Sequence, residues 1–388
     1  MKVAGNRSFD FSQLVLDILI FLACFNFVGR GPVVFFVFCL YAIFKTKGVR
    51  WNRTCILYLS LSIFAVIASI IYFDTNEVVK SLMYFLSFIA GYRLVTISKE
   101  DTFLIRQLVF FATLGFIAYL AFVGYLNIIV LGHTAGFRLM VNPWNGVETP
   151  ATIFGLLACV PISYSFYCFF CQNNNILKLL GVVFLVIALW VNMETATRTP
   201  FVLMGVVYAV MFLVLFKTQN RRSSVKVVLL IALVVVLWNA FFFTDLSKTI
   251  IFERFSENRL ESSRWDIMKV YLDHMWEYPW GGGFVEKNYH TMSHNFLQEA
   301  YDTYGVLFAL PLLLVFAGVF VRFIRLAAAK WKNRVSLLFL SLYIGVFLQL
   351  MMEPVIVGYP QLIWVYFMVD GFVVSSLAHK RNILFVSA

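Results

Sequence analysis

Residues 54–73 read TCILYLSLSIFAVIASIIYF, twenty consecutive residues without a charged side chain. An α-helix rises about 1.5 Å per residue, so a run of this length crosses the roughly 30 Å hydrocarbon core of a bilayer. After a short polar interval, residues 79–97 form a second mostly apolar run. The two runs predict a pair of membrane-spanning helices joined by a turn.

The same pattern extends along the whole chain of 388 residues, of which 61% are hydrophobic and 13% charged. Soluble domains are about 45–50% apolar and about 25% charged, so the composition excludes a soluble fold of this size. We therefore expect an all-α polytopic membrane protein, a single membrane domain over residues 1–388. About twelve spans are predicted: 11–28, 32–45, 54–73, 79–97, 103–131, 149–170, 176–194, 199–216, 225–244, 304–322, 335–352 and 360–378.

Two features of the chain have alternative interpretations. The apolar run at 11–28 lacks a small-x-small cleavage site, which favours a retained first helix over a signal peptide. All six cysteines lie in or beside apolar runs, so we expect neither a disulfide framework nor a zinc site at the Cys168–Cys171 pair.

Basic residues gather in alternate loops, which sets the predicted orientation. By the positive-inside rule these loops, and both termini, are cytoplasmic, and the formal charge of +11 is a topology signal rather than a nucleic-acid footprint. The cytoplasmic set is Lys45, Lys47, Arg50, Arg53, Lys99, Lys178, Lys217, Arg221, Arg222, Lys226, Arg322, Arg325, Lys330, Lys332, Arg334, Lys380 and Arg381. One large loop, about 245–303, is then extracytoplasmic.

The large loop predicts two helices separated by a turn. Ser263 can cap a helix to about Glu277, whose apolar face of Trp265, Met268, Leu272, Met275 and Trp276 is typical of a helix resting on the membrane surface or on the bundle. Pro279 and Gly281–Gly283 end it and permit close backbone approach. Ser293 is the expected cap of the next helix, which continues into the span 304–322.

Arg198 is the most informative of five arginines expected on the extracytoplasmic side, the others being Arg138, Arg254, Arg259 and Arg264. Thr199 as N-cap and Pro200 as first helical residue predict a helix start beside Arg198. A guanidinium at this positive end is unfavourable unless an anion such as phosphate binds. The alternative is a surface ion pair, with Glu194 for Arg198 and with Glu257 and Glu261 for Arg259 and Arg264.

Three further ionisable residues are candidates. His294 is expected at a helix N-terminus near the membrane boundary, either as a reactive group or as a structural histidine. Asp17 and Asp370 lie within apolar runs, where acids are rare and often functional. For these two acids, a proton-relay role competes with solvation of Asp17 near a membrane surface and bonding of Asp370 to a neighbouring helix.

The ordered motifs over about 130–310 resemble those of the O-antigen polymerase (Wzy-type) and O-antigen ligase superfamily. They are Arg138 in FRLMVNPWNG, Thr197-Arg198-Thr199, Arg264-Trp265, Pro279-Trp-Gly-Gly-Gly, His294-Asn295-Phe-Leu-Gln and Asp302-x-x-Gly305. Asp302 departs from the family, which more often has Glu at this position, but a carboxylate side chain is retained.

The resemblance implies extracytoplasmic glycosyl transfer from oligosaccharides linked by pyrophosphate to undecaprenol. His294 would be the base, with Arg198 and Arg264 stabilising the leaving group. Arg138, Arg254, Arg259, Asn295 and Asp302 would bind or orient substrate. No Asp-x-Asp or Glu-x-Asp motif occurs, so neither metal nor cofactor is expected. Membrane lipids and a chain-length regulator protein are candidate partners, in a bacterial inner membrane with the active site facing the periplasm.

Four functions remain open on the sequence. The leading one is a surface polysaccharide polymerase, which transfers the growing glycan onto a new lipid-linked repeat unit. An O-antigen ligase transferring polymer to lipid A-core differs only in the acceptor, and an oligosaccharyltransferase acting on protein is a related alternative. A lipid-linked oligosaccharide flippase belongs to another class, and the concentration of polar residues in one outer loop disfavours it.

Overall fold

The computed structural model describes residues 11–46, 51–97, 103–133, 139–195, 197–218, 263–290, 293–328, 334–356 and 358–378. Seven of the helices are long and apolar enough to cross a membrane, and four more apolar helices are shorter. Together they correspond to every predicted span except 225–244, which lies outside the described residues. The chain is therefore an all-α multi-pass membrane protein, as the sequence predicts.

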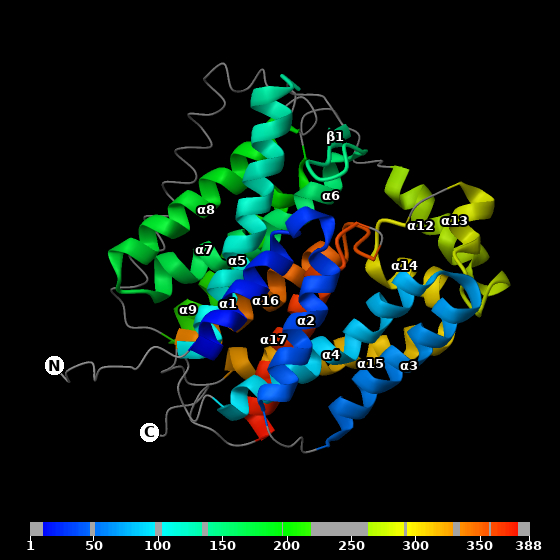
Figure 1. The fold of residues 1–388 in the computed structure, drawn as a ribbon, viewed down its shortest axis with the longest axis horizontal. Helices are drawn as coiled ribbons and strands as arrows, with labels where there is room; N and C mark the ends of the chain where they lie inside the picture. The colour runs from blue at the N-terminus through cyan, green and yellow to red at the C-terminus, as the bar shows by residue number, and fades with distance from the viewer. Residues whose placement is uncertain are drawn as a thin grey trace.

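The described elements alternate helices with short connections (Figure 1). The first part of the chain forms α1 (Phe11–Cys24), η1 (Phe27–Gly29), α2 (Gly31–Lys45), α3 (Arg53–Tyr72), α4 (Thr75–Ile97), α5 (Phe103–Gly124) and the π-helical η2 (Tyr125–Val130). A two-stranded hairpin, β1 (Leu139–Val141) and β2 (Glu148–Pro150), follows, with Leu139 opposite Pro150. The predicted span 149–170 is divided into α6 (Ala151–Gly155), η3 (Leu156–Ala158) and α7 (Cys159–Cys171).

The remaining elements include the two helices predicted in the large loop. They are α8 (Asn175–Glu194), α9 (Thr199–Thr218), α12 (Ser263–His274), η5 (Met275–Glu277), α13 (Phe284–Tyr289), α14 (Phe296–Tyr304), α15 (Val306–Ala328), α16 (Arg334–Leu350) and α17 (Gln361–Ala378). Helix α12 and η5 together reach Glu277, the predicted end.

Helix α17 is the buried centre of the bundle, since every residue from Gln361 to Ser376 is buried. It crosses α4 at glycines on both helices: a Cβ on Gly91 would collide with the carbonyl oxygen of Met368, and one on Gly371 with that of Phe88. Small residues allow such close approach of backbones in membrane proteins, where van der Waals packing drives association.

A buried ion pair joins α17 to three other helices. Arg322 donates from Nε and Nη2 to the two carboxylate oxygens of Asp370, at 2.8 and 2.7 Å, and the hydroxyls of Tyr58 and Tyr343 donate to the same carboxylate. The expectation that Asp370 bonds to a neighbouring helix is confirmed. The assignment of Arg322 to a cytoplasmic loop is wrong, because α15 continues to Ala328 and holds Arg322 inside the bundle. Asp17 accepts from the amide of Gln107.

The first residue of α1 and the last of α17 lie at the same end of the bundle (Figure 1). The hydroxyl of Tyr359, just before α17, donates to the carbonyl oxygen of Cys24 at the end of α1, at 2.7 Å. The end of α1 therefore also lies beside the start of α17, and the two helices run in opposite directions.

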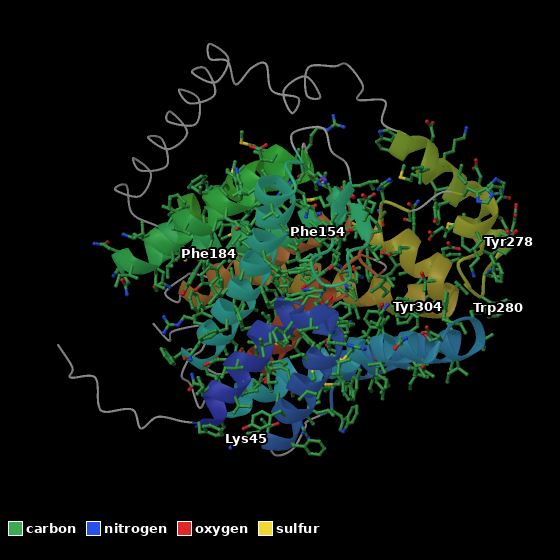
Figure 2. All side chains as sticks on the ribbon, turned by 45° about the horizontal axis from the view of Figure 1, so that its top comes forward. Lys45, Phe154, Phe184, Tyr278, Trp280 and Tyr304 are labelled. Atoms are coloured by element: carbon green, nitrogen blue, oxygen red, sulfur yellow. The ribbon has the colours of Figure 1, made fainter. Side chains whose placement is uncertain are left out.

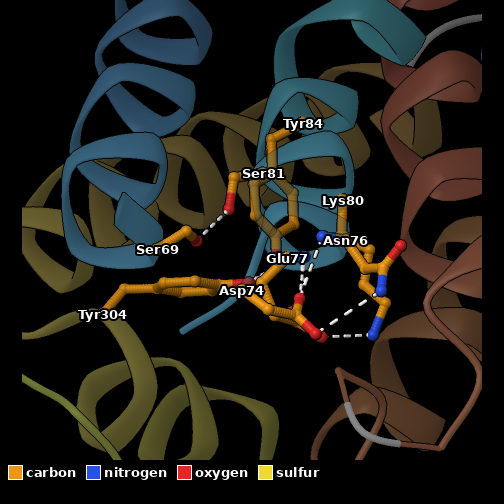
Figure 3. Close-up of polar contacts among 8 residues, drawn as sticks. All are labelled: Ser69, Asp74, Asn76, Glu77, Lys80, Ser81, Tyr84 and Tyr304. Carbon is orange, nitrogen blue, oxygen red and sulfur yellow. Dashed lines mark hydrogen bonds and ion pairs between the residues drawn. The ribbon is translucent and has the colours of Figure 1, made fainter. Parts of the chain in front are cut away.

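The corner between α3 and α4 supports α14 (Figure 3). Asp74 accepts from the backbone N–H groups of Asn76 and Glu77 and so caps α4. About two turns beyond Glu77 on α4, the hydroxyl of Tyr84 lies 3.4 Å from that of Tyr304, the last residue of α14. Helix α14 is thereby tied at its C-terminal end to the spanning helices.

One predicted helix start is wrong. Asn295, rather than Ser293, caps α14, since its Oδ1 accepts from the N–H of Leu297 at 2.8 Å, and Ser293 Oγ instead accepts from the N–H of Asn295. Nor does this helix continue directly into the next span. Gly305 breaks it with a φ of +80°, and the N–H of Val306 donates to the carbonyl of Pro279.

Candidate functional site

The glycine turn at 281–283 packs against the C-terminal end of α14. The N–H of Gly282 donates to the carbonyl of Thr303 at 3.1 Å, and that of Gly283 to the carbonyl of Asp302 at 2.8 Å. A Cβ on Gly281 would lie 2.6 Å from the nitrogen of Gly305, so only glycine fits. The predicted close backbone approach is confirmed, and it fixes α13 and α14 side by side. In Figure 2, Tyr278 and Trp280 lie at the margin of this part of the molecule, and Tyr304 lies further in.

Asp302 is a positioning residue for α13. Its two carboxylate oxygens accept from the N–H groups of Val285, at 2.9 Å, and Glu286, at 3.1 Å, which begin that helix. Burial raises the pKa of Asp302, and these two hydrogen bonds offset part of the rise. The side chain is 3% exposed, so its geometry suits support of the loop better than direct contact with a substrate.

His294 lies at the N-terminal end of α14, next to the capping Asn295. Its side chain is 31% exposed, and its Nδ1 lies 3.7 Å from Oε2 of Glu353. This distance is longer than a hydrogen bond, and catalytic hydrogen bonds are often long before substrate binds. The structure thus pairs the predicted histidine with a buried carboxylate.

Glu353 is 1% exposed, and its position is fixed from two sides. The hydroxyl of Thr199 donates to its Oε1 at 3.0 Å. The backbone that follows is held by Glu299 on α14, whose Oε2 accepts from the N–H groups of Val355 at 2.7 Å and Ile356 at 3.0 Å. The turn after α16, the start of α9 and the start of α14 therefore meet at Glu353.

Glu353 is not among the site residues predicted from the sequence. The available signal was its placement in LMMEPVIVGYP, an acid at the end of a span followed by Pro354, because acids at such depth are seldom incidental. Its partners, however, come from segments far away in the sequence, so the pairing itself was not predictable from local pattern.

Arg198 directly precedes α9, which begins at Thr199, one residue earlier than predicted. Its carbonyl oxygen accepts from the N–H of Val202, which makes Arg198 the capping position, and its side chain is exposed. The expected N-cap role of Thr199 is wrong, because Thr199 is the first residue of α9; its hydroxyl donates to the Glu353 carboxylate. Arg198 thus precedes, by a single residue, the group that holds Glu353.

A cavity of about 220 Å³ lies beside His294. It is formed by α12, the start of α14 and the residues that follow α16. Its lining consists of Trp265, Ile267, Met268, His294, Asn295, Gln298, Met351 and Met352. Two residues of the predicted apolar face of α12, Trp265 and Met268, face this cavity, whereas Leu272 and Trp276 are 54% and 69% exposed.

The structure brings some of the sequence-predicted site residues together and leaves others undetermined. His294, Asn295 and Arg198 lie around Glu353 and the cavity, and Arg264 is in the first turn of α12, directly before Trp265. Asp302 lies at the other end of α14. Arg138, Arg254 and Arg259 lie outside the described residues.

The fold and the site define a class, the multi-pass α-helical membrane protein with a His–Glu pair at the ends of its helices. Within that class, residues 183–308 match the family model described as O-antigen ligase. The match confirms, over that segment, the resemblance to the O-antigen polymerase and ligase superfamily, and it supports a polymerase- or ligase-type function. The segment contains Arg198, Arg264, His294, Asn295 and Asp302, whereas Glu353 lies beyond it. No curated protein matches the chain.

Proposed function

We propose that the protein is a surface polysaccharide polymerase, which transfers a growing glycan from undecaprenyl pyrophosphate onto a new lipid-linked repeat unit. The observation that carries the proposal is the 3.7 Å approach of His294 Nδ1 to the buried Oε2 of Glu353, beside the helix start that bears Arg198. Together with the family match over 183–308, this arrangement supplies a base and a cation for glycosyl transfer.

His294 acts as the general base in this proposal. Glu353 receives the Nδ1–H group, which leaves Nε2 as the acceptor for a proton and stabilises the imidazolium that forms. The acceptor hydroxyl oxygen forms a bond to the anomeric carbon while the bond from that carbon to the diphosphate oxygen breaks. The proton moves to Nε2, the electron pair leaves with the diphosphate, and the configuration inverts.

Arg198 holds the diphosphate in this proposal. Its position at the first turn of α9 places a guanidinium and a helix N-terminus together, and both favour an anion. Arg264 is the proposed second ligand, and Arg138, Arg254 and Arg259 are proposed further contacts. Arginines would then stabilise the leaving group without a metal ion.

The proposed location is a bacterial inner membrane, with both termini in the cytoplasm and the site facing the periplasm. The support is the basic character of the loops at the opposite end from the site, such as that bearing Lys45 at the end of α2. Residues 245–303 would then form a large periplasmic loop within the single membrane domain. A chain-length regulator protein is the proposed partner.

A ligase is the second candidate, because the matching family model is described as O-antigen ligase. Deletion of the gene separates the two. Loss of a polymerase leaves lipid A-core bearing one repeat unit, whereas loss of a ligase leaves bare core and polymer on the lipid carrier. Undiminished long-chain polysaccharide on the deleted cells would contradict both functions.

Site variants connect this phenotype to the geometry. His294→Ala and Arg198→Ala should each reduce polymer at least about 100-fold, the usual contribution of a general base or of one charge-stabilising donor. His274→Ala and Arg325→Ala are matched controls, because both residues lie away from the cavity. The variants should reach the membrane at wild-type amounts, which immunoblotting checks. Near-normal polymer from both site variants would overturn the mechanism.

A further inference from the structure

The cavity beside His294 differs in chemistry from the side of the site that bears Arg198. Among the residues that the structure describes, eight line the cavity; none of them carries a carboxylate, a guanidinium or an ammonium group, and His294 is the ionisable side chain among them. The lining instead combines an exposed indole, two amide side chains and three thioethers. Glu353 lies behind His294, between this cavity and the start of α9.

Two polar groups in the lining are available to a ligand. Gln298 Nε2 makes a 3.4 Å contact with the carbonyl of Met268, and within the described chain its Oε1 accepts no hydrogen bond. Asn295 uses Oδ1 to cap α14, and among the described residues its Nδ2 contacts the sulfur of Met351 at 4.0 Å, a weak acceptor. One acceptor and one donor therefore face the cavity from the same helix end.

Trp265 supplies an apolar surface opposite these amides. Its side chain is 65% exposed although it belongs to the cavity lining, so a ligand entering the cavity would cover the ring. An indole ring beside amides that donate and accept suits a sugar ring, which has apolar C–H faces and hydroxyl edges.

We propose that this cavity is the acceptor subsite and that it takes an uncharged sugar residue. The inference rests on the proposed function, since it assigns the acceptor to the cavity and the donor diphosphate to the Arg198 side. Among the described lining residues, a uronic acid or phosphorylated sugar would meet no guanidinium or ammonium group, and it would approach the Glu353 carboxylate behind His294. The charged diphosphate of the donor would thus bind on the Arg198 side of His294, and the uncharged acceptor sugar on the cavity side.

The test measures binding without turnover. The protein is labelled with 5-fluorotryptophan and purified in nanodiscs, and Trp265→Phe assigns the fluorine resonance of Trp265 among the nine tryptophans. The probes are the methyl glycosides of glucose, galactose, mannose, rhamnose and N-acetylglucosamine, with the methyl glycosides of glucuronic and galacturonic acid as charged counterparts, each to about 100 mM because a single sugar binds weakly.

At least one neutral glycoside should shift the Trp265 resonance saturably, and Gln298→Leu should weaken that binding at least about tenfold. The resonance of Trp276, which is on the same helical segment but outside the lining, should not move, and Trp276→Ala should bind as the wild type does. The absence of any shift with the neutral glycosides, or equal or tighter binding of a uronic acid, would overturn the inference.

The outcomes separate this inference from the proposed function. Loss of polymer in His294→Ala cells without any binding of neutral glycosides would leave the function standing and remove the subsite. Binding of a neutral glycoside by a protein whose deletion leaves surface polysaccharide intact would keep the sugar site and remove the polymerase.

Discussion

At the scale of single residues, the buried carboxylate of Glu353 is the group around which the candidate site is organised. A carboxylate that is 1% exposed is costly to bury, and here a hydroxyl from α9 and a histidine from the start of α14 both approach it. In the proposed mechanism a hydrogen bond from Nδ1 of His294 to this carboxylate sets the tautomer and leaves Nε2 to accept a proton. The pair is therefore the part of the molecule where substitution should affect chemistry more than folding.

Substitution of Glu353 should reduce transfer without removing the histidine. Glu353→Gln keeps the acceptor for Thr199 but removes the charge that stabilises the imidazolium, so we expect polymer formation to fall about 100-fold or more. Thr199→Val should reduce polymer formation about tenfold, because it removes the hydrogen bond that positions the Glu353 carboxylate but leaves its charge. The rate of radiolabelled sugar incorporation into polymer measures both.

The control for these two variants is Glu148→Gln on β2, an exposed glutamate whose charge lies away from the cavity. It should incorporate sugar at the wild-type rate. If Glu353→Gln behaved as this control does, Glu353 would have only a structural role.

The sequence predicted part of this site for clear physical reasons. His294, Asn295 and Arg198 stand at helix starts, and helix starts leave local signals such as caps and prolines. Glu353 and Glu299 leave no comparable signal, because their partners are set by the packing of α9, α14 and the turn after α16. The bond from the hydroxyl of Thr199 to Glu353 was not predictable for the same reason, and Thr199 was expected to cap α9 instead.

At the scale of elements, the crossing of α4 and α17 depends on two glycines. Gly91→Ala would place a methyl group against the backbone of Met368, and we expect a loss of stability of about 1–3 kcal/mol. Gly205→Ala on α9 is the matched control, because a Cβ there meets nothing within 4 Å and alanine favours the helix. Thermal unfolding in detergent measures both, and equal stability of the two variants would contradict the packing described.

The ion pair between Arg322 and Asp370 makes a second prediction about elements. Asp370→Asn or Arg322→Met alone leaves one charge buried without its counterpart, which should lower stability by about 3–5 kcal/mol. The double variant should be more stable than either single variant. The same unfolding measurement tests this order, and additive losses would show that the two side chains do not interact.

Most element boundaries followed from the sequence because apolar run length directly determines spanning helices. The exceptions lie where tertiary contacts replace the local rule. Gly305 interrupts a pattern that looked continuous, since the N–H of Val306 bonds to Pro279 instead of to the preceding turn. Arg322 looked like a loop residue because its buried partner, Asp370, lies on another helix.

At the scale of the whole molecule, the proposed topology places the basic loops on the opposite side of the membrane from the site. The six cysteines are all buried and unbridged, so engineered cysteines can report on orientation with little background. Asn145 in the β1–β2 hairpin and Asn173 between α7 and α8 are both exposed and lie at opposite ends of the α6–α7 segment.

In intact cells whose outer membrane has been permeabilised, Asn145→Cys should react with a membrane-impermeant maleimide, and Asn173→Cys should react only after the inner membrane is opened. This result follows if the basic loops are cytoplasmic. The reverse pattern of labelling would invert the topology and place the site in the cytoplasm.

The most direct test of the account is glycan transfer by the purified protein. The lipid-linked repeat unit is isolated from deleted cells and mixed with the protein in nanodiscs, with chelator present, and mass spectrometry follows the lipid products. The wild type should form linked repeats and release one undecaprenyl pyrophosphate for each new bond, and His294→Ala should form none. Equal transfer by His294→Ala, or no transfer by a folded wild-type protein, would contradict the role assigned to the His294–Glu353 site.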